Sequence, residues 1–225
     1  MVIEQLVGAM ATDAKMRFQT LTVGPVSCTC CIVACAETGE AAIVDPGGDA
    51  DEILAKVASM AVTVKLVLHT HAHFDHILGT GEVVAATRAE VLLHASDRDL
   101  YQNLPRQGRT FGFHAARPPA VARWLAGGET LAIGRLSALV IPTPGHTPGS
   151  VGYYFAAPSP LLLAGDTLFA DGVGRTDFPG GSLADLRVSI RERLYALPAE
   201  TRVIPGHGPE TSIGYERQHN PFVRA

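Results

Sequence analysis

Short apolar segments separated by turn residues run through most of the chain. Residues 17–23 alternate between polar and apolar side chains, and this period of two predicts a strand. Residues 62–68 are apolar and β-branched, which is typical of a strand buried on both faces. The other predicted strands span 28–36, 41–45, 90–94, 130–133, 135–141, 151–155, 161–164 and 203–204.

Helical spacing occupies a smaller part of the chain. The predicted helices span about 49–60, 76–88, 96–100 and 182–197. Asp49 or Asp51 is the expected cap of the first helix, and Ser96 caps the short third one. Ser182 forms a capping box with Asp185. The apolar stripe behind it comprises Leu183, Leu186, Ile190, Leu194 and Leu197.

The order of these elements indicates one α/β domain. Strands predominate, helices are interspersed, and no linker separates two similar halves. We therefore expect two sheets packed back to back with helices outside, over residues 17–225. Residues 102–122 are rich in proline and glycine and predict a loop. Residues 1–16 have no clear pattern and are expected to form an N-terminal extension, with at most a short frayed helix.

Composition and charge narrow the range of partners. The 225 residues are 47% hydrophobic and 18% charged, which is enough apolar material for a sizeable core. A net charge of −4 without a Lys/Arg cluster argues against nucleic acid. No apolar run approaches the roughly 18 residues of a membrane span. Because Glu4 precedes every basic residue, the start is unlike a signal peptide, and a cytoplasmic protein is expected.

Four cysteines crowd into one predicted strand without the spacing of a structural zinc site. In a strand, Cys28 and Cys30 face one side, while Cys31 and Cys35 face the other. We interpret them as small buried hydrophobes.

Residues 69–76 carry the strongest chemical signal. They read His-Thr-His-Ala-His-Phe-Asp-His, with four histidines and one aspartate in eight residues. Imidazole and carboxylate groups are ligands that zinc, iron and manganese share. In an extended backbone His71 and His73 point the same way. Asp75 and His76 follow where the chain must turn and aim elsewhere, so two adjacent metal ions are predicted. A histidine-rich surface loop is disfavoured, because an apolar run precedes the motif and a helical pattern follows it.

Three later loops each follow an apolar strand and offer one more ligand. His146 lies in Pro-Gly-His-Thr-Pro-Gly, Asp166 in Ala-Gly-Asp-Thr-Leu-Phe, and His207 in Pro-Gly-His-Gly. Glycine and proline shape such loops and let the backbone approach closely. Each loop alone is typical of an ordinary turn or cap, but together with residues 71–76 they complete two sites.

These motifs resemble those of the metallo-β-lactamase superfamily. Residues 70–76 match its Thr-His-x-His-x-Asp-His signature, and the later loops match in order. The resemblance covers nearly all of residues 17–225. It implies a four-layer αβ/βα sandwich that binds two divalent metal ions, with zinc expected and iron or manganese as alternatives. The implied ligands are His71, His73 and His146 for one ion, Asp75, His76 and His207 for the other, and Asp166 as the bridge.

Within the superfamily, the chain is most similar to glyoxalase II-type hydrolases (hydroxyacylglutathione hydrolases). The likeness lies in residues 44–48, 165–169, 174–178 and 205–222, and it points to a compact bacterial subgroup without the C-terminal helical domain. It implies hydrolysis of a small-molecule thioester, S-lactoylglutathione or a related acyl-glutathione. Full-length enzymes use a tyrosine where this chain has Gly208-Pro209, and basic residues from the absent domain. The thiol carrier therefore stays open.

The expected mechanism uses a metal-bridging hydroxide. Two ions lower the pKa of a bridging water from 15.7 to about 7. Asp75 is then both a ligand and a catalytic residue, because its second oxygen can hold the proton of the nucleophile. A thiolate with a pKa near 8.5 departs without a strong acid, which favours thioesters over amides.

Two further residues have two interpretations each. Asp45 is either an acceptor behind a ligating histidine or a residue that shapes the turn at Pro46. Gly174 and Arg175 match the glyoxalase II loop that contacts glutathione, but Arg175 is as readily a surface arginine paired with Asp177. The histidines expected to be packed or solvated are His69, His94, His114 and His219.

Residues 174–178 also resemble persulfide dioxygenases, oxidoreductases of the same fold with a single iron. Their last motif reads Pro-Ala-His-Asp, whereas Pro-Gly-His-Gly at 205–208 favours the hydrolase. Asp166 at the bridge disfavours a lactamase, and the charge and the lack of an RNA-binding arm disfavour a nuclease. A non-catalytic metal-binding interaction module would be marked by the loss of a ligand, and none is missing.

Overall fold

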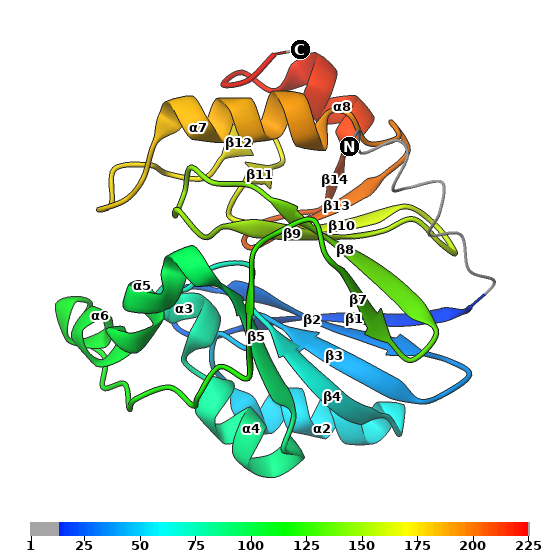
Figure 1. Cartoon of the computed structure of the whole chain (residues 1–225), viewed down its shortest axis with the longest axis vertical. Coiled ribbons are helices and arrows are strands. Elements are labelled where there is room, and N and C mark those ends of the chain that lie inside the picture. The colour runs from blue at the N-terminus through cyan, green and yellow to red at the C-terminus, as the bar shows by residue number, and fades with distance from the viewer. Residues whose placement is uncertain (1–13, 225) are drawn as a thin grey trace.

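A computed structural model describes residues 14–224 and contains two six-stranded sheets packed face to face, with helices on both outer faces (Figure 1). In that view, strands β1 to β5 and their helices form the lower layers, and the yellow to red second half forms the upper layers. The predicted four-layer sandwich is confirmed.

The first sheet has the strand order β1-β2-β3-β4-β5-β6. Strands β1, β2 and β3 pair antiparallel, whereas β3 to β6 run parallel. The strands are β1 (Met16–Val23), β2 (Cys28–Cys35), β3 (Glu40–Val44), β4 (Thr63–Leu68), β5 (Glu90–His94) and β6 (Arg123–Leu125). Because β3, β4 and β5 are parallel, the loops that follow them meet at one edge of the sheet.

The second sheet has the order β14-β13-β10-β9-β8-β7. Strands β8 and β10 both pair antiparallel with β9, and β10 runs parallel to β13, so the ends of β8, β10 and β13 share one edge. The strands are β7 (Thr130–Ile133), β8 (Leu136–Pro142), β9 (Val151–Phe155), β10 (Leu161–Gly165), β13 (Arg202–Pro205) and β14 (Thr211–Ser212). A hairpin of β11 (Leu168–Phe169) and β12 (Gly172–Val173) follows β10.

The helices lie over the outer faces of both sheets and beside one end of the first sheet. They are α2 (Ala50–Met60), α3 (Phe74–Ile77), α4 (Thr80–Thr87), α5 (Arg98–Gln102), α6 (Leu104–Thr110), α7 (Leu183–Val188) and α8 (Ile213–His219). Helices α2 and α4 lie below the first sheet in Figure 1, and α7 and α8 lie above the second. Buried apolar side chains form one cluster between the sheets and one beneath each helical layer.

The helix predicted over 76–88 is in fact two helices, α3 and α4, which separate at Gly79. The Gly79 N–H donates to the Pro46 carbonyl at 2.8 Å. A Cβ at Gly79 would lie 2.9 Å from that oxygen, so the loop after β3 packs directly against the break. The helix is interrupted because the backbone at Gly79 packs against the backbone at Pro46, although the sequence pattern is continuous.

The predicted loop over 102–122 is wrong in part, because it contains α6. Pro105 stands in the first turn of this helix, where the missing N–H removes no helical hydrogen bond. Strand β6, which directly follows this stretch, was not predicted. Three residues are too few for a periodic pattern, and β6 forms because β5 offers an open edge.

The predicted caps have mixed outcomes. Asp49 precedes α2, but its carboxylate accepts from the Gly24 N–H at 2.8 Å and does not cap the helix. Ser96 lies inside a 3-10 turn, Ala95–Asp97, and caps nothing. Ser182 does cap α7 by accepting from the Asp185 N–H at 3.2 Å. Leu183 is 41% exposed, so it does not join the buried stripe.

The four cysteines are free and buried as predicted. Cys28 and Cys30 pack in the cluster beneath α2 and α4, and Cys31 and Cys35 pack between the sheets. The predicted extension lies mostly outside the described residues, but Met16 already belongs to β1. Within residues 14–224, no helix is long and apolar enough to cross a membrane.

Candidate metal centre

The ligand motif begins where β4 ends. Asp45, the first residue after β3, accepts hydrogen bonds from the Thr70 N–H at 2.8 Å and from the Thr70 hydroxyl at 2.6 Å. Its carboxylate therefore fixes the start of the motif. Helix α3 begins at Phe74, so Asp75 and His76 leave the extended course of the preceding residues.

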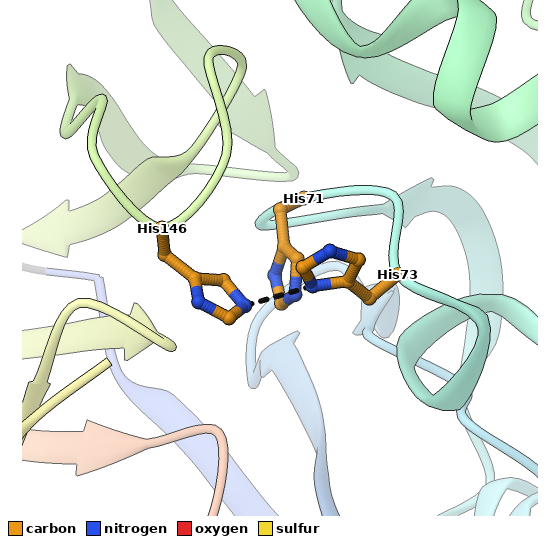
Figure 2. Close-up of side chains that lie close together, drawn as sticks. All are labelled: His71, His73 and His146. Atoms are coloured by element: carbon orange, nitrogen blue, oxygen red, sulfur yellow. Dashed lines mark hydrogen bonds between the residues drawn. The ribbon is translucent and has the colours of Figure 1, made fainter. Parts of the chain in front are cut away.

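Seven side chains come together in three overlapping groups, and in each group the possible ligand atoms all lie within 4.8 Å of one another. The groups are His71, His73 and His146; Asp75, His76 and His207; and His71, His76 and Asp166. The first two, called here the first and second triads, are the sets that the resemblance implied. Figure 2 shows the rings of His71 and His73 turned toward His146, with His73 Nδ1 at 2.8 Å from His146 Nε2.

Asp166 lies between the two triads. Its Oδ2 is 3.5 Å from His146 Nε2, and its Oδ1 is 3.4 Å from His76 Nε2. Each carboxylate oxygen thus faces a histidine of a different triad, which is the arrangement that a bridging ligand requires. Asp75 Oδ2 lies 3.2 Å from His207 Nε2 within the second triad.

The outer ring nitrogens of three histidines lie against hydrogen-bond acceptors. The pairs are His76 Nδ1 with Asp45 Oδ2 (3.0 Å), His146 Nδ1 with the Arg175 carbonyl (2.7 Å) and His207 Nδ1 with the Ser27 carbonyl (3.2 Å). An acceptor in this position places the proton on Nδ1 and leaves Nε2 available as a ligand. Asp45 thus has the contact expected of an acceptor behind a ligating histidine.

Asp97 is a site residue that the sequence reasoning missed. Its carboxylate accepts from the Ala72 N–H at 3.0 Å, the Thr147 hydroxyl at 2.8 Å and the Gly149 N–H at 2.7 Å. It therefore joins the loop of His71 and His73 to the loop of His146. The available signal was its position after β5, at the sheet edge where the ligand motif also lies.

The electrostatics of the first triad favour neutral imidazoles. Burial and the neighbouring imidazoles lower the pKa of His71 well below its usual range. Burial and His146 lower the pKa of His73 to about 3. Metal ions bind histidine in the neutral form, so no proton has to leave these two rings.

In the second triad, positive charge balances the carboxylates. Burial opposes ionisation of Asp75, but His207 and His76 lower its pKa to about 2. Burial would lower the pKa of His76, but the neighbouring Cys28 and the carboxylates of Asp166 and Asp45 raise it well above its usual range. A cation bound here would replace the imidazolium proton, so metal binding is expected to release protons.

The buried polar atoms of these groups that lack a hydrogen-bond partner fit the binding of two divalent ions. Among the described residues, His71 Nε2, His76 Nε2 and Asp166 Oδ1 are buried atoms without a hydrogen-bond partner. Leaving such an atom unpaired costs about 1–3 kcal/mol. All three belong to the groups of possible ligands, so bound cations would satisfy them together.

Two glycines allow the close packing around Asp166. A Cβ on Gly174 would lie 1.8 Å from the Asp166 carbonyl oxygen, and one on Gly206 would lie 2.1 Å from Asp166 Oδ1. Gly174 does not line the cavity described below, so packing explains it without a substrate contact.

A cavity of about 860 Å³ opens onto both triads. Arg175 lines it, but its guanidinium also donates to both carboxylate oxygens of Asp177 at 2.6 and 2.7 Å, and its side chain is 57% exposed. The surface ion pair proposed for Arg175 is therefore present, and the cavity position leaves a substrate contact open.

The four histidines without an assigned role stay outside all three groups of possible ligands. His69 is buried with its Nε2 at 3.2 Å from the Thr80 hydroxyl, and His219 stacks on Tyr215. The His94 side chain accepts from the Ser96 N–H, and His114 is exposed.

Curated relatives match almost the full length of the chain. The probable metallo-hydrolase YqgX of Bacillus subtilis is 36% identical over 210 residues, which are 92% of this chain and 98% of that protein. The hydroxyacylglutathione hydrolase GloC of Haemophilus influenzae is 34% identical over 187 residues, which are 82% of this chain and 88% of that protein.

Solved structures with the same fold also match almost the full length of this chain. The BLEG-1 B3 metallo-β-lactamase matches with 36% identity and a TM-score of 0.86, over 93% of this chain and 100% of that one. TTHA1623 in a di-iron-bound form matches with 36% identity and a TM-score of 0.84, over 91% and 100%. ETHE1 from Myxococcus xanthus matches with 31% identity and a TM-score of 0.74, over 92% and 84%. Because a model of the metallo-β-lactamase superfamily also matches residues 23–207, this chain belongs to that superfamily, as one of its metal-dependent hydrolases.

Proposed function

We propose that this chain is a binuclear metal-dependent hydrolase that cleaves a thioester, S-lactoylglutathione or a related acyl-glutathione. The observation that carries the proposal is a pair of complete triads with Asp166 between them. The likeness to GloC, which is named a hydroxyacylglutathione hydrolase, supports the substrate class.

In this proposal the first triad would hold one divalent ion, the second triad would hold the other, and Asp166 would be a ligand shared by both. When bound, the ions supply Lewis acidity and a water of lowered pKa. Zinc is the proposed metal, with iron and manganese as alternatives. The di-iron form of TTHA1623 supports iron as an alternative in a site of this fold.

The chain's own part in the reaction falls to Asp75. Asp75 is 9% exposed and lines the cavity, and its carboxylate is held ionised, so it can orient the attacking water and accept its proton. The water oxygen bonds to the thioester carbonyl carbon, the carbon–sulfur bond breaks, and the thiolate leaves with the electron pair. The proton that Asp75 accepted then passes to the thiolate, so the carboxylic acid and the thiol are the products. The thiolate needs no strong acid to depart.

An anionic thiol carrier such as glutathione is supported by a second cavity arginine. Arg106 lines the cavity, and its guanidinium makes no hydrogen bond or ion pair with another residue between 14 and 224. Arg175 is already bonded to Asp177. A carboxylate of the carrier would pair with Arg106 first, and Arg175 is the second proposed contact. We assign no substrate contact to Gly174, because it packs against Asp166 and shapes the loop that carries Arg175.

A persulfide dioxygenase with a single iron is the second candidate, because residues 174–178 also resemble that family. One iron would need only one set of ligands, whereas the second triad here is complete. The hydrolase is therefore the better supported candidate.

Metal analysis of the purified protein combined with S-lactoylglutathione hydrolysis tests the proposal. About two ions per chain and thioester cleavage are expected. Asp166→Asn should lower kcat/KM by at least about a hundredfold, more than loss of an outer partner does. Asp51→Asn, an exposed position on α2, is the matched control.

Fewer than two ions with no cleavage of any thioester would overturn the proposal. Oxygen uptake with glutathione persulfide without thioester cleavage would reverse the ranking of the two candidates. Cleavage of a β-lactam alone would instead assign the chain the activity named for BLEG-1.

A further inference from the structure

We infer that the cavity selects thioesters with an apolar acyl group, aromatic or branched, and that Phe111 and Phe178 form its acyl subsite. The inference rests on the proposed thioester hydrolysis and adds the acyl class to it. It disfavours the small hydroxylated lactoyl group as the preferred acyl group.

A series of ring contacts leads away from the metal centre along the cavity. The ring of His73 in the first triad lies 5.4 Å from that of Phe178, edge to face. Phe178 lies 6.1 Å from Phe111, also edge to face, and Phe111 stacks on Phe74 at 4.7 Å. All four residues line the cavity, so an aromatic wall begins beside a proposed metal ligand.

This wall leaves apolar surface uncovered at the cavity. Phe111 is 45% exposed, and Val26, which also lines the cavity, is 46% exposed. Burial of apolar surface is favourable, and one buried CH₂ strengthens binding about fourfold. An acyl group that covers these side chains therefore gains affinity with each apolar carbon.

Two polar side chains that line the cavity, Gln107 and Asp97, already have hydrogen-bond partners within the protein. Gln107 on α6 accepts from the Phe74 N–H at 3.0 Å, and its amide donates to the carbonyls of Ala72 and Leu100 at 3.0 and 2.8 Å. The carboxylate of Asp97, which also lines the cavity, accepts three hydrogen bonds. A hydroxyl buried here without a partner would be penalised.

The test compares thioesters that share one leaving thiol. S-Lactoylglutathione and S-isobutyrylglutathione differ by a hydroxyl in place of a methyl group, and S-phenylacetylglutathione adds an aromatic ring. We expect kcat/KM to rise from lactoyl to isobutyryl to phenylacetyl, with about a tenfold difference between the first and the last.

Variants locate the preference in the structure. Phe111→Ser should reduce the phenylacetyl-to-lactoyl ratio of kcat/KM to near one, and Phe111→Leu should retain part of that ratio. Phe178→Leu is a second variant of the same wall. It also removes the ring over which the Arg175 guanidinium lies at 3.9 Å, so its readout is the ratio between acyl groups on one shared thiol and not the overall rate. Phe222→Leu is the matched control, because Phe222 is 53% exposed and does not line the cavity.

The outcomes separate the inference from the proposed function. A wild-type preference for lactoyl, or a ratio that neither Phe111→Ser nor Phe178→Leu changes, would overturn the acyl subsite and leave thioester hydrolysis standing. Absence of cleavage for all three thioesters by the metal-loaded protein would overturn both.

Discussion

The two halves of the molecule build their parts of the centre in different ways. The first half supplies four of the seven grouped residues from one short segment, residues 71–76, directly after β4. The second half supplies His146, Asp166 and His207 from three separate loops, after β8, β10 and β13. The first part is therefore encoded locally, whereas the second exists only once β8, β10 and β13 have assembled into one sheet.

The halves also differ in what supports their histidines. In the first half, the buried carboxylate of Asp45 accepts from Thr70 and contacts His76 Nδ1 at 3.0 Å. In the second half, His146 and His207 are placed by backbone carbonyls. A carboxylate raises the basicity of a metal-bound imidazole more than a carbonyl does. In the first half, loss of the Asp45 carboxylate alone should therefore weaken metal binding. In the second half, no single supporting side chain should have such an effect.

Asp45→Asn should have the largest effect, and it should act on metal affinity. Asp45 adopts φ 53°, a conformation that asparagine also tolerates, so the backbone is preserved. Loss of the charge behind His76 should weaken metal binding by about 10–100-fold, with a parallel fall in activity. Retention of metal during dialysis against a graded chelator measures it.

Asp171→Asn is the matched control in the second half. Asp171 also adopts φ 53° but is exposed in the turn between β11 and β12. It should retain metal like the wild type. Equal retention by Asp45→Asn and Asp171→Asn would remove the proposed asymmetry between the halves.

Asp97→Asn should have an intermediate effect, because Asp97 is shared by the two halves. An amide in its place would turn an NH₂ group toward the N–H of Ala72 or Gly149, or toward the Thr147 hydroxyl. One unsatisfied buried donor should lower the free energy of unfolding by about 1–3 kcal/mol. Urea denaturation measures this, with the exposed Asp99→Asn as control. An unchanged free energy of unfolding would mean that Asp97 does not hold the loops together.

The same contrast explains how much could be predicted from the sequence. The extended-then-turning course of residues 71–76 follows from local periodicity, and the glycine-rich loops mark the places of His146, Asp166 and His207. Asp97 and Gln107 were missed, because their hydrogen bonds join segments far apart in the sequence. Helix α6 was missed for a related reason. It carries Pro105 and Gly108, and its place depends on packing against α3 and α5 and not on its own periodicity.

Tyr195→Phe should have the smallest effect, confined to stability and to the second half. The Tyr195 hydroxyl donates to the carbonyls of Glu216 and Val223 at 3.0 and 2.8 Å, which tie the C-terminal segment to the end of the α7 layer. Burial and the nearby Glu216 raise the pKa of Tyr195 to about 12. Below pH 10 the phenylalanine variant should be less stable by about 1 kcal/mol, with unchanged metal content and activity.

The raised pKa of Tyr195 sets the direction in which its contribution to the free energy of unfolding changes with pH. An unfolded tyrosine titrates near pH 10, below the folded pKa, so the folded state binds the extra proton. The stability from Tyr195 is therefore fully present below about pH 10 and is lost as the pH rises toward 12. The difference between wild type and Tyr195→Phe in urea denaturation should shrink over that range, because the other tyrosines titrate in both proteins. A difference independent of pH would show that folding does not raise the pKa of Tyr195.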